Sequence, residues 1–253
     1  MKKPGDTRIL EDLLASLPHR DHPVRAVWSC AFWTLVTTKY SGLSSTLRGE
    51  ERQHSDHADI TVPDAGRLLE KTAGELADFA LLEDSVAASI GMAAVNSMIE
   101  VDESKCVERG AVDLLVEKGR GRTIGVVGHF GFVPKLRAAA KKLYVIEQRP
   151  RPGDLPDTAA PDVLPSCDVV CLTATSFINH TIERLLPLCE KAYVVLTGPT
   201  SPLAPALFHH GIDAICGSRV TDPNAVLRLI SQGACFKQVR GNGVRLLTML
   251  AGD

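Results

Sequence analysis

The sequence has almost no excess of charge of either sign. Its 28 lysine and arginine residues face 30 aspartate and glutamate residues, which gives a formal net charge of −2 over 253 residues. Proteins that bind nucleic acid or anionic membranes mainly through charge carry a clear basic excess. We therefore expect neither nucleic acid nor a membrane among the partners of this chain.

Long apolar runs and paired cysteines are also missing. No stretch of about 18 uncharged apolar residues is present, so no membrane-spanning helix is predicted. After Lys2 and Lys3, the charges of Asp6, Arg8 and Glu11 interrupt the apolar run that a secretory signal requires. The seven cysteines form no Cys-x-x-Cys pair and are too sparse for a disulfide scaffold. These absences predict a soluble protein of the reducing cytoplasm.

The common motifs of catalysis and cofactor binding are incomplete or missing. There is no Gly-x-Ser-x-Gly nucleophile elbow. The dinucleotide fingerprint Gly-x-Gly-x-x-Gly fails because Val126 stands where the glycine before Gly128 and Gly131 should be. No spacing among the histidines, cysteines and acidic residues is diagnostic of a metal site. Motifs alone therefore leave open whether the chain is an enzyme.

The first hundred residues predict a small α+β domain. Apolar periodicity and turn residues predict a helix over residues 7–17, strands over 24–38 and 43–47, and helices over 63–82 and 85–98. The two strands are expected to form an antiparallel hairpin or meander. The apolar segment 27–36 is expected at the surface, where it would favour a homodimer. His54 and His57 lie in a polar segment and are expected to be solvated.

After Gly121 the pattern changes to strand, turn and helix, repeated along the rest of the chain. Short and nearly continuous apolar runs predict strands over residues 123–127, 143–147, 168–173, 192–197 and 213–216. Strands that alternate with helices are typical of a parallel sheet with helical crossovers. The predicted fold class is α/β: a smaller N-terminal α+β domain over 1–104, and a Rossmann-like domain over 105–253 that begins with a helical linker over 105–118.

The loops that leave the predicted parallel strands are rich in glycine and hydroxyl side chains. Ligands of open parallel sheets bind outside the carboxyl ends of the strands, near the first turns of the helices. The predicted binding residues are Gly128, His129, Phe130, Gly131, Glu147, Thr173, Thr175, Asn179, Gly198, Pro199, Thr200 and Ser201, with Asn96 from the N-terminal domain. We expect them to line a small-molecule site in the cleft between the domains. The plainer interpretation of each hydroxyl residue is that it caps a helix.

Three side chains near this sheet edge carry chemistry of their own. His129 and Glu147 are candidates for a catalytic acid and base. His129, Glu147 and His180 are candidate ligands for a divalent transition metal. Glu147 also has the spacing of a carboxylate that binds a ribose hydroxyl, so a nucleotide cofactor such as NAD or S-adenosylmethionine is an alternative. A non-catalytic binding module is the third alternative.

The same segments resemble a known family. Gly-x-x-Gly-Phe at 128–132, a strand ending at Glu147, the set Thr175, Asn179 and Thr181, and Gly-Pro-Thr-Ser-Pro-Leu at 198–203 are similar to a family of unknown function to which heavy-metal chelation is ascribed. In the N-terminal half, residues 40–43 and 90–96 are similar as well.

This resemblance implies a Rossmann-like C-terminal domain, an N-terminal domain like that of enolase, and a site in the cleft between the two. It further implies a role in heavy-metal chelation or in chelator- or corrinoid-related metabolism. The family tends to carry serine where Thr200 stands, and His129 does not belong to the matching positions.

Overall fold

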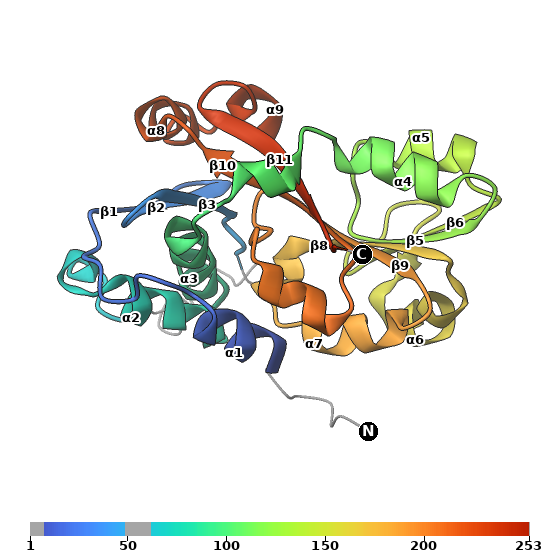
Figure 1. Cartoon of the computed structure of the whole chain (residues 1–253), viewed down its shortest axis with the longest axis horizontal. Helices are drawn as coiled ribbons and strands as arrows, with labels where there is room; N and C mark the ends of the chain where they lie inside the picture. Colours follow the sequence, from blue (N-terminus) through green and yellow to red (C-terminus); the bar gives the residue numbers. More distant parts are fainter. Residues whose placement is uncertain (1–7, 49–61, 253) are drawn as a thin grey trace.

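The computed structural model describes residues 8–48 and 62–252. The segment with His54 and His57 lies outside these residues. Two sheets organise the described chain, one with three strands and one with eight (Figure 1). The chain is an α/β protein, as the sequence predicts.

The N-terminal part is a three-stranded meander packed on a buried helix. Strands β1 (Ala26–Ser29), β2 (Trp33–Thr37) and β3 (Ser41–Ser45) pair antiparallel in chain order. Helix α3 (Ser85–Met98) begins at Asp84, whose side chain accepts a hydrogen bond from the Ala87 amide. Helix α1 (Arg8–Ala15) buries the apolar face that its periodicity predicts. The likeness to the N-terminal domain of enolase stays a prediction.

Two predictions for this part are wrong in detail. The helix expected over 63–82 is replaced by shorter pieces: a 3-10 turn η2 (Leu68–Glu70), α2 (Ala73–Ala77) and a 3-10 turn η3 (Asp78–Leu81). Thr72 separates them, because it is held extended by a bridge to Pro23 and starts α2 through a reciprocal capping box with Glu75.

The apolar segment 27–36 is not an exposed strand. It turns between β1 and β2, and both faces of β2 are covered: Leu35 is buried in a cluster with residues of α8 (Pro223–Ile230), and Val36 is buried in the cluster that includes α3. Its exposed large apolar side chains are Trp28 and Phe32, at 48% and 55%. The homodimer therefore stays a prediction with less apolar surface to support it.

The larger sheet contains the predicted parallel strands. Its bounds are β4 (Cys106–Val107), β5 (Thr123–Val127), β6 (Lys142–Glu147), β7 (Leu155–Pro156), β8 (Val169–Thr173), β9 (Tyr193–Thr197), β10 (Ala214–Val220) and β11 (Val244–Leu250). The strand order is β4-β11-β10-β9-β8-β5-β6-β7, and every pair from β7 to β10 is parallel. Among the parallel strands, β5 comes first in the chain. The chain then adds β6 and β7 on one side of β5 and crosses to β8 on its other side. The boundary between β5 and β8 is therefore the topological switch point, where ligands of such sheets bind.

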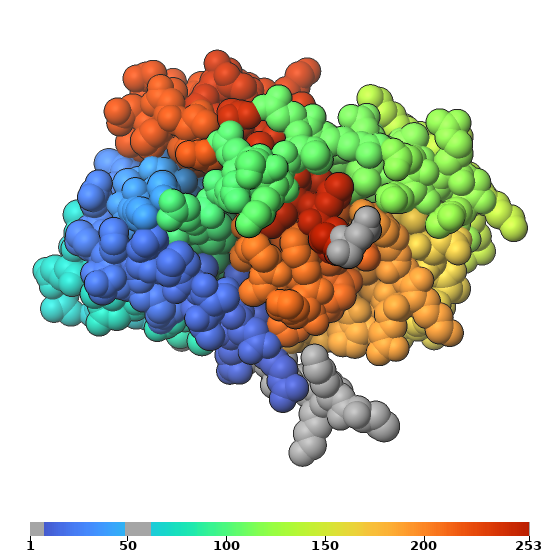
Figure 2. Space-filling model, in the orientation of Figure 1, coloured from blue at the N-terminus to red at the C-terminus, as the bar shows by residue number. Residues whose placement is uncertain are grey.

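Helices cover both faces of this sheet (Figure 1). Helices α4 (Ala111–Gly119) and α5 (Val133–Ala139) lie on one face, and the short helices α6 (Ala160–Val163) and α7 (Ile182–Leu185) lie on the other. The core beneath α6 and α7 continues without a break into the N-terminal part, where it includes α1 and α3. The two parts lie in direct contact (Figure 2), and the predicted boundary near residue 104 stays a prediction.

The connector and the C-terminal strands differ from expectation. The helix predicted over 105–118 begins only at Ala111, because Cys106 and Val107 form β4. β4 pairs antiparallel with β11, an unpredicted strand that also pairs antiparallel with β10. Helices α8 (Pro223–Ile230) and α9 (Phe236–Val239) fill the interval between β10 and β11. Within the described residues, none of the helices has the length and apolar character needed to cross a bilayer.

Candidate functional site

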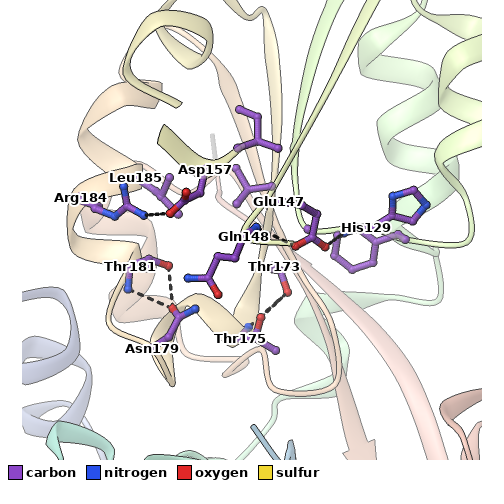
Figure 3. A pocket seen from close by; sticks show the side chains of 14 residues that line it. His129, Glu147, Gln148, Asp157, Thr173, Thr175, Asn179, Thr181, Arg184 and Leu185 are labelled. Carbon is purple, nitrogen blue, oxygen red and sulfur yellow. Dashed lines mark hydrogen bonds and ion pairs between the residues drawn. The ribbon is translucent and has the colours of Figure 1, made fainter. Parts of the chain in front are cut away.

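A cavity of about 190 Å³ opens at the switch point of the large sheet. Its walls come from the residues that follow β5, β6 and β8, together with the start of α7 (Figure 3). The lining residues are Val127, Gly128, His129, Phe130, Ile146, Glu147, Gln148, Asp157, Thr173, Thr175, Asn179, Thr181, Arg184 and Leu185. The predicted residues at the ends of β5, β6 and β8 therefore meet around one hollow.

The loop after β5 is shaped by a glycine that no other residue replaces easily. Gly128 has φ 105°, in the left-handed region, and its amide donates to the Ile146 carbonyl at 2.9 Å. A Cβ at this position would lie 3.1 Å from the Cβ of Thr173 on the neighbouring strand end. Gly128 thus lets the loop turn sharply and lie close to β8.

Glu147 fixes this loop against the end of β6. One carboxylate oxygen accepts a hydrogen bond from the backbone amide of His129 at 2.5 Å, and the other accepts one from the Gln148 amide at 3.2 Å. Each oxygen can accept one more hydrogen bond. The carboxylate is therefore held in place while it remains able to accept hydrogen bonds from a ligand in the cavity.

Paired polar side chains form the rest of the wall. The hydroxyls of Thr173 and Thr175 lie 2.9 Å apart, and Thr181 donates through its hydroxyl to Asn179 Oδ1 at 2.8 Å. Figure 3 shows the Gln148 side chain reaching between these two groups. The wall thus offers hydroxyl and amide groups already oriented by one another.

An ion pair stands at one side of the cavity. Arg184 donates to the Asp157 carboxylate at 3.0 Å, and both residues lie on the lining (Figure 3). Neither residue was predicted, because the sequence does not indicate β7, which Asp157 directly follows, and Arg184 lies within α7. Val127 at the end of β5 and Gln148 directly after β6 are missed lining residues that their positions at strand ends could have indicated.

His129 enters the cavity wall mainly through its backbone. Its imidazole points away from the centre of the hollow (Figure 3), and Nδ1 donates to Asp154 at 3.0 Å. The Asp154 side chain is only 3% exposed. Burial opposes its ionisation, but hydrogen bonds from the Arg151 amide and from His129 outweigh burial and hold the pKa of Asp154 below its usual value. The imidazole is therefore not set against the Glu147 carboxylate as an acid–base pair requires.

The candidate metal ligands do not converge either. His180 has φ 56° and donates from Nε2 to the Ala80 carbonyl at 2.8 Å, which directs its ring toward the N-terminal part. Across residues 8–48 and 62–252, no group of three or more His, Cys, Asp or Glu side chains is arranged to hold a metal ion. The described side chains therefore do not fit a resident metal at the predicted site.

The cysteines near the sheet are buried thiols. Burial raises the pKa of Cys167 and of Cys216 to about 11, and that of Cys171 well above its usual value. All three pack as small apolar residues in the core.

The remaining predicted residues lie elsewhere. Gly131, Gly198 and Pro199 line a second cavity on the other side of the 128–132 loop. Thr200 and Ser201 are buried at the junction of the two parts, where Thr200 Oγ1 accepts from the Ser45 amide at 2.9 Å. Asn96 donates at this junction to the Thr200 carbonyl at 3.1 Å. Here the expected cleft is a packed contact.

A hollow between the two parts does exist, but it has a different lining. Its volume is about 370 Å³, and Asn96 is the predicted residue on its wall. The other walls come from the end of β2, the turn into β3 and the last residues of β10, including Lys39, Tyr40 and Arg219. The predicted strand-end residues are not part of it.

Comparisons with known proteins agree with the resemblance seen in the sequence. Two family models, both described as "putative heavy-metal chelation", match residues 10–99 and 110–249. An uncharacterized protein of Methanocaldococcus jannaschii is 26% identical over 210 residues, which are 79% of this chain and 78% of that protein.

Two crystal structures of proteins with unknown function are similar over almost the whole chain. One, from Desulfitobacterium hafniense, has a TM-score of 0.83 and 26% identity, and the match covers 99% of this chain and 100% of that one. The other, from Pyrococcus horikoshii, has a TM-score of 0.78 over 96% of this chain and 98% of that one, and at 19% identity it shows the fold alone. The chain belongs to the family described as "putative heavy-metal chelation".

Proposed function

We propose that this protein binds a small, hydroxyl-bearing organic molecule in the cavity at the switch point. The observation that carries the proposal is the meeting of polar groups from three strand ends, with Glu147, Thr173 and Thr175 on one lining. Their local hydrogen bonds orient them before any ligand binds, which reduces the entropy cost of binding. The Glu147 carboxylate can only accept hydrogen bonds, so a ligand hydroxyl that donates a hydrogen bond suits this side of the cavity.

The volume of the cavity limits the size of the ligand. Its volume of about 190 Å³ is below the range of roughly 300–1,000 Å³ that is usual for drug-sized ligands. A small polar metabolite, or one part of a longer ligand, fits this space. A whole corrinoid ring does not, so a corrinoid-related role would require a fragment or precursor.

The family description can be met without a metal bound by the protein. Because the described side chains do not form a metal centre, we propose that heavy-metal chelation is a property of the small molecule and that the protein binds or processes this chelator. Oxygen-rich chelators carry the hydroxyl and carboxyl groups that the Thr173, Thr175 and Arg184 side chains recognise.

We also propose that the protein works in the reducing cytoplasm. Its seven cysteines are all free thiols, as they would be in that compartment.

A nucleotide is the second candidate for the same cavity. Glu147 ends the strand next to the glycine-containing loop after β5, which is where dinucleotide folds place the carboxylate that binds ribose hydroxyls. In this alternative the cavity holds the ribose of NAD or S-adenosylmethionine. The hydroxyl chemistry at Glu147 is the same in both cases.

Thermal unfolding with added ligands tests both candidates. Wild-type protein is melted with citrate, ribose, adenosine, 2′,3′-dideoxyadenosine, NAD and S-adenosylmethionine, because a ligand that binds only the folded state raises Tm. The nucleotide alternative predicts a rise with adenosine and none with the dideoxy compound.

The matched variants are Glu147→Gln, which keeps the shape of the side chain, and Glu190→Gln, an exposed change outside the cavity. We expect Glu147→Gln to weaken binding of a stabilising ligand by about tenfold or more and Glu190→Gln to leave it unchanged. Equal binding by both variants would remove this cavity as the site.

A further inference from the structure

A second and larger cavity lies behind the 128–132 loop. It has a volume of about 450 Å³ and extends from the carboxyl end of β9 and the middle of β10 and β11 to the start of α4. Phe130 lines both this cavity and the one at the switch point, so the loop is the partition between them. None of the residues proposed to bind the first ligand, Glu147, Thr173 and Thr175, lines the second cavity.

Three aromatic rings line this second cavity. Phe130 and Phe132 are stacked, with ring centroids 4.8 Å apart and an angle of 7° between the ring planes. Phe236 at the start of α9 also lines the cavity and contacts Trp33. Three phenylalanines thus offer apolar faces and edges, against which a planar ring packs well.

Cationic side chains outnumber carboxylates on the lining. The lining includes three cationic side chains, Arg109, Lys135 and Arg240, and one carboxylate, Asp113. Arg109 is engaged in an ion pair with Glu117. Within the described chain, Lys135 and Arg240 have no carboxylate partner, although ion pairs occupy many of the other cations.

The single carboxylate belongs to the start of α4. Helix α4 begins at the cavity wall with Gly110 as its N-cap, and Asp113 in its first turn places its carboxylate beside this helix start. A carboxylate in the first turn suits the positive end of the helix dipole. Lys135 and Arg240 are therefore the partners that remain for the anionic end of a ligand.

We propose that this second cavity binds a small molecule that carries both an aromatic ring and an anionic group, either phosphate or carboxylate. The ring packs against Phe130 and Phe132, and the anionic group is bound by Lys135 and Arg240. Because Phe130 is shared, a ligand here lies directly across the partition from the ligand of the first cavity.

Calorimetric titration with simple probes tests this proposal. Phenyl phosphate and benzoate carry both features, phenol carries only the ring, and inorganic phosphate carries only the charge. We expect one of the two anionic aromatic probes to bind at least about tenfold more tightly than phenol and than inorganic phosphate, and the tighter of the two identifies the anionic group. Binding of both no tighter than phenol would overturn the proposal.

Variants locate the binding. Lys135→Ala and Arg240→Ala should each weaken binding of the preferred probe about threefold, whereas Arg137→Ala, an exposed change on the same helix that lies outside the lining, should not. If all three variants bind the preferred probe as tightly as wild type does, the probe binds elsewhere and the proposal is wrong. These residues do not line the first cavity, so failure here leaves the proposed function standing, and the reverse also holds.

Discussion

Asn96 and Thr200 join the two parts of the molecule although 104 residues separate them. The Asn96 side-chain amide on α3 donates to the Thr200 carbonyl at 3.1 Å and to the Leu43 carbonyl of β3 at 2.9 Å. One amide group thus connects the buried helix, the meander and the loop after β9. Asn96 therefore holds the junction together, and its contact with a ligand stays a prediction.

Replacing Asn96 with alanine should therefore destabilise the protein and not merely alter a site. The change leaves two partly buried carbonyls without a donor, which costs about 1–3 kcal/mol of the free energy of unfolding. Urea unfolding followed by circular dichroism measures this loss. Asn242→Ala is the matched control, because Asn242 is exposed and makes one local bond to the Gln238 carbonyl. A loss no larger than that of the control would contradict the role given to Asn96.

Gly91 should be intolerant of any side chain. A Cβ there would lie 2.0 Å from the backbone nitrogen of Ala80, so α3 cannot keep its distance from the η3 turn. We expect Gly91→Ala to lower the free energy of unfolding by about 3 kcal/mol. Gly131→Ala provides the comparison, since nothing lies within 4 Å of its added Cβ. Similar denaturation midpoints for both variants would show that the helix can shift away at little cost.

Thiol labelling should separate the cysteines by burial. Burial raises the pKa of Cys189 to about 12 and that of Cys167 to about 11, whereas Cys235 is exposed. Because the thiolate is the reactive form, we expect a brief treatment with iodoacetamide at pH 7.5 to modify Cys235 first. Peptide mass spectrometry reads the positions, and a urea-unfolded sample shows that every thiol can react. Equal labelling of Cys189 and Cys235 in native protein would contradict this order.

Acid should weaken the contact between His129 and Asp154. Hydrogen bonds hold the pKa of Asp154 below its usual value in the folded protein, so folding favours the ionised carboxylate. Its contribution to stability is complete above the unfolded pKa of about 3.9 and is lost as the pH falls through the lower folded pKa. Asp154→Asn should therefore have a lower Tm than wild type at pH 7.

The difference in Tm between wild type and Asp154→Asn should narrow as the pH falls below about 4. Asp162→Asn, at an exposed position, controls for the loss of a surface charge. A difference in Tm that stays constant from pH 7 to pH 3 would show that ionisation of Asp154 does not stabilise the fold.

The sequence predicted the central sheet well because burial on both faces leaves a strong pattern. A short, continuous apolar run such as 123–127 indicates a strand that is covered on both faces. β5 has the predicted bounds. β11 was missed because no crossover helix follows it and its exposed Arg245 interrupts the apolar run. The false helix over 63–82 arose because helical periodicity does not reveal the tertiary bridge from Pro23 to Thr72.

For the candidate site, position at a strand end was informative and residue type was not. Gly128, Glu147 and Thr175 share a cavity because parallel strands end at one edge of a sheet. Thr200 also follows a strand, but the Ser45 amide of β3 uses its hydroxyl, and nothing local in the sequence indicates that contact. Asp157 and Arg184 reach the cavity through an ion pair that depends on the completed fold.

The position of β11 has a consequence for the order in which the protein is completed during synthesis. β11 is the last strand of the large sheet in chain order, yet it lies between β10 and the connector strand β4. Until β11 has been synthesised, neither β10 nor β4 has this antiparallel neighbour, and Leu247 and Met249, which are buried in the folded protein, are not yet in place. The connector is therefore secured only after translation has passed this strand, and nascent chains that stop before it are the natural targets of chaperones and proteases.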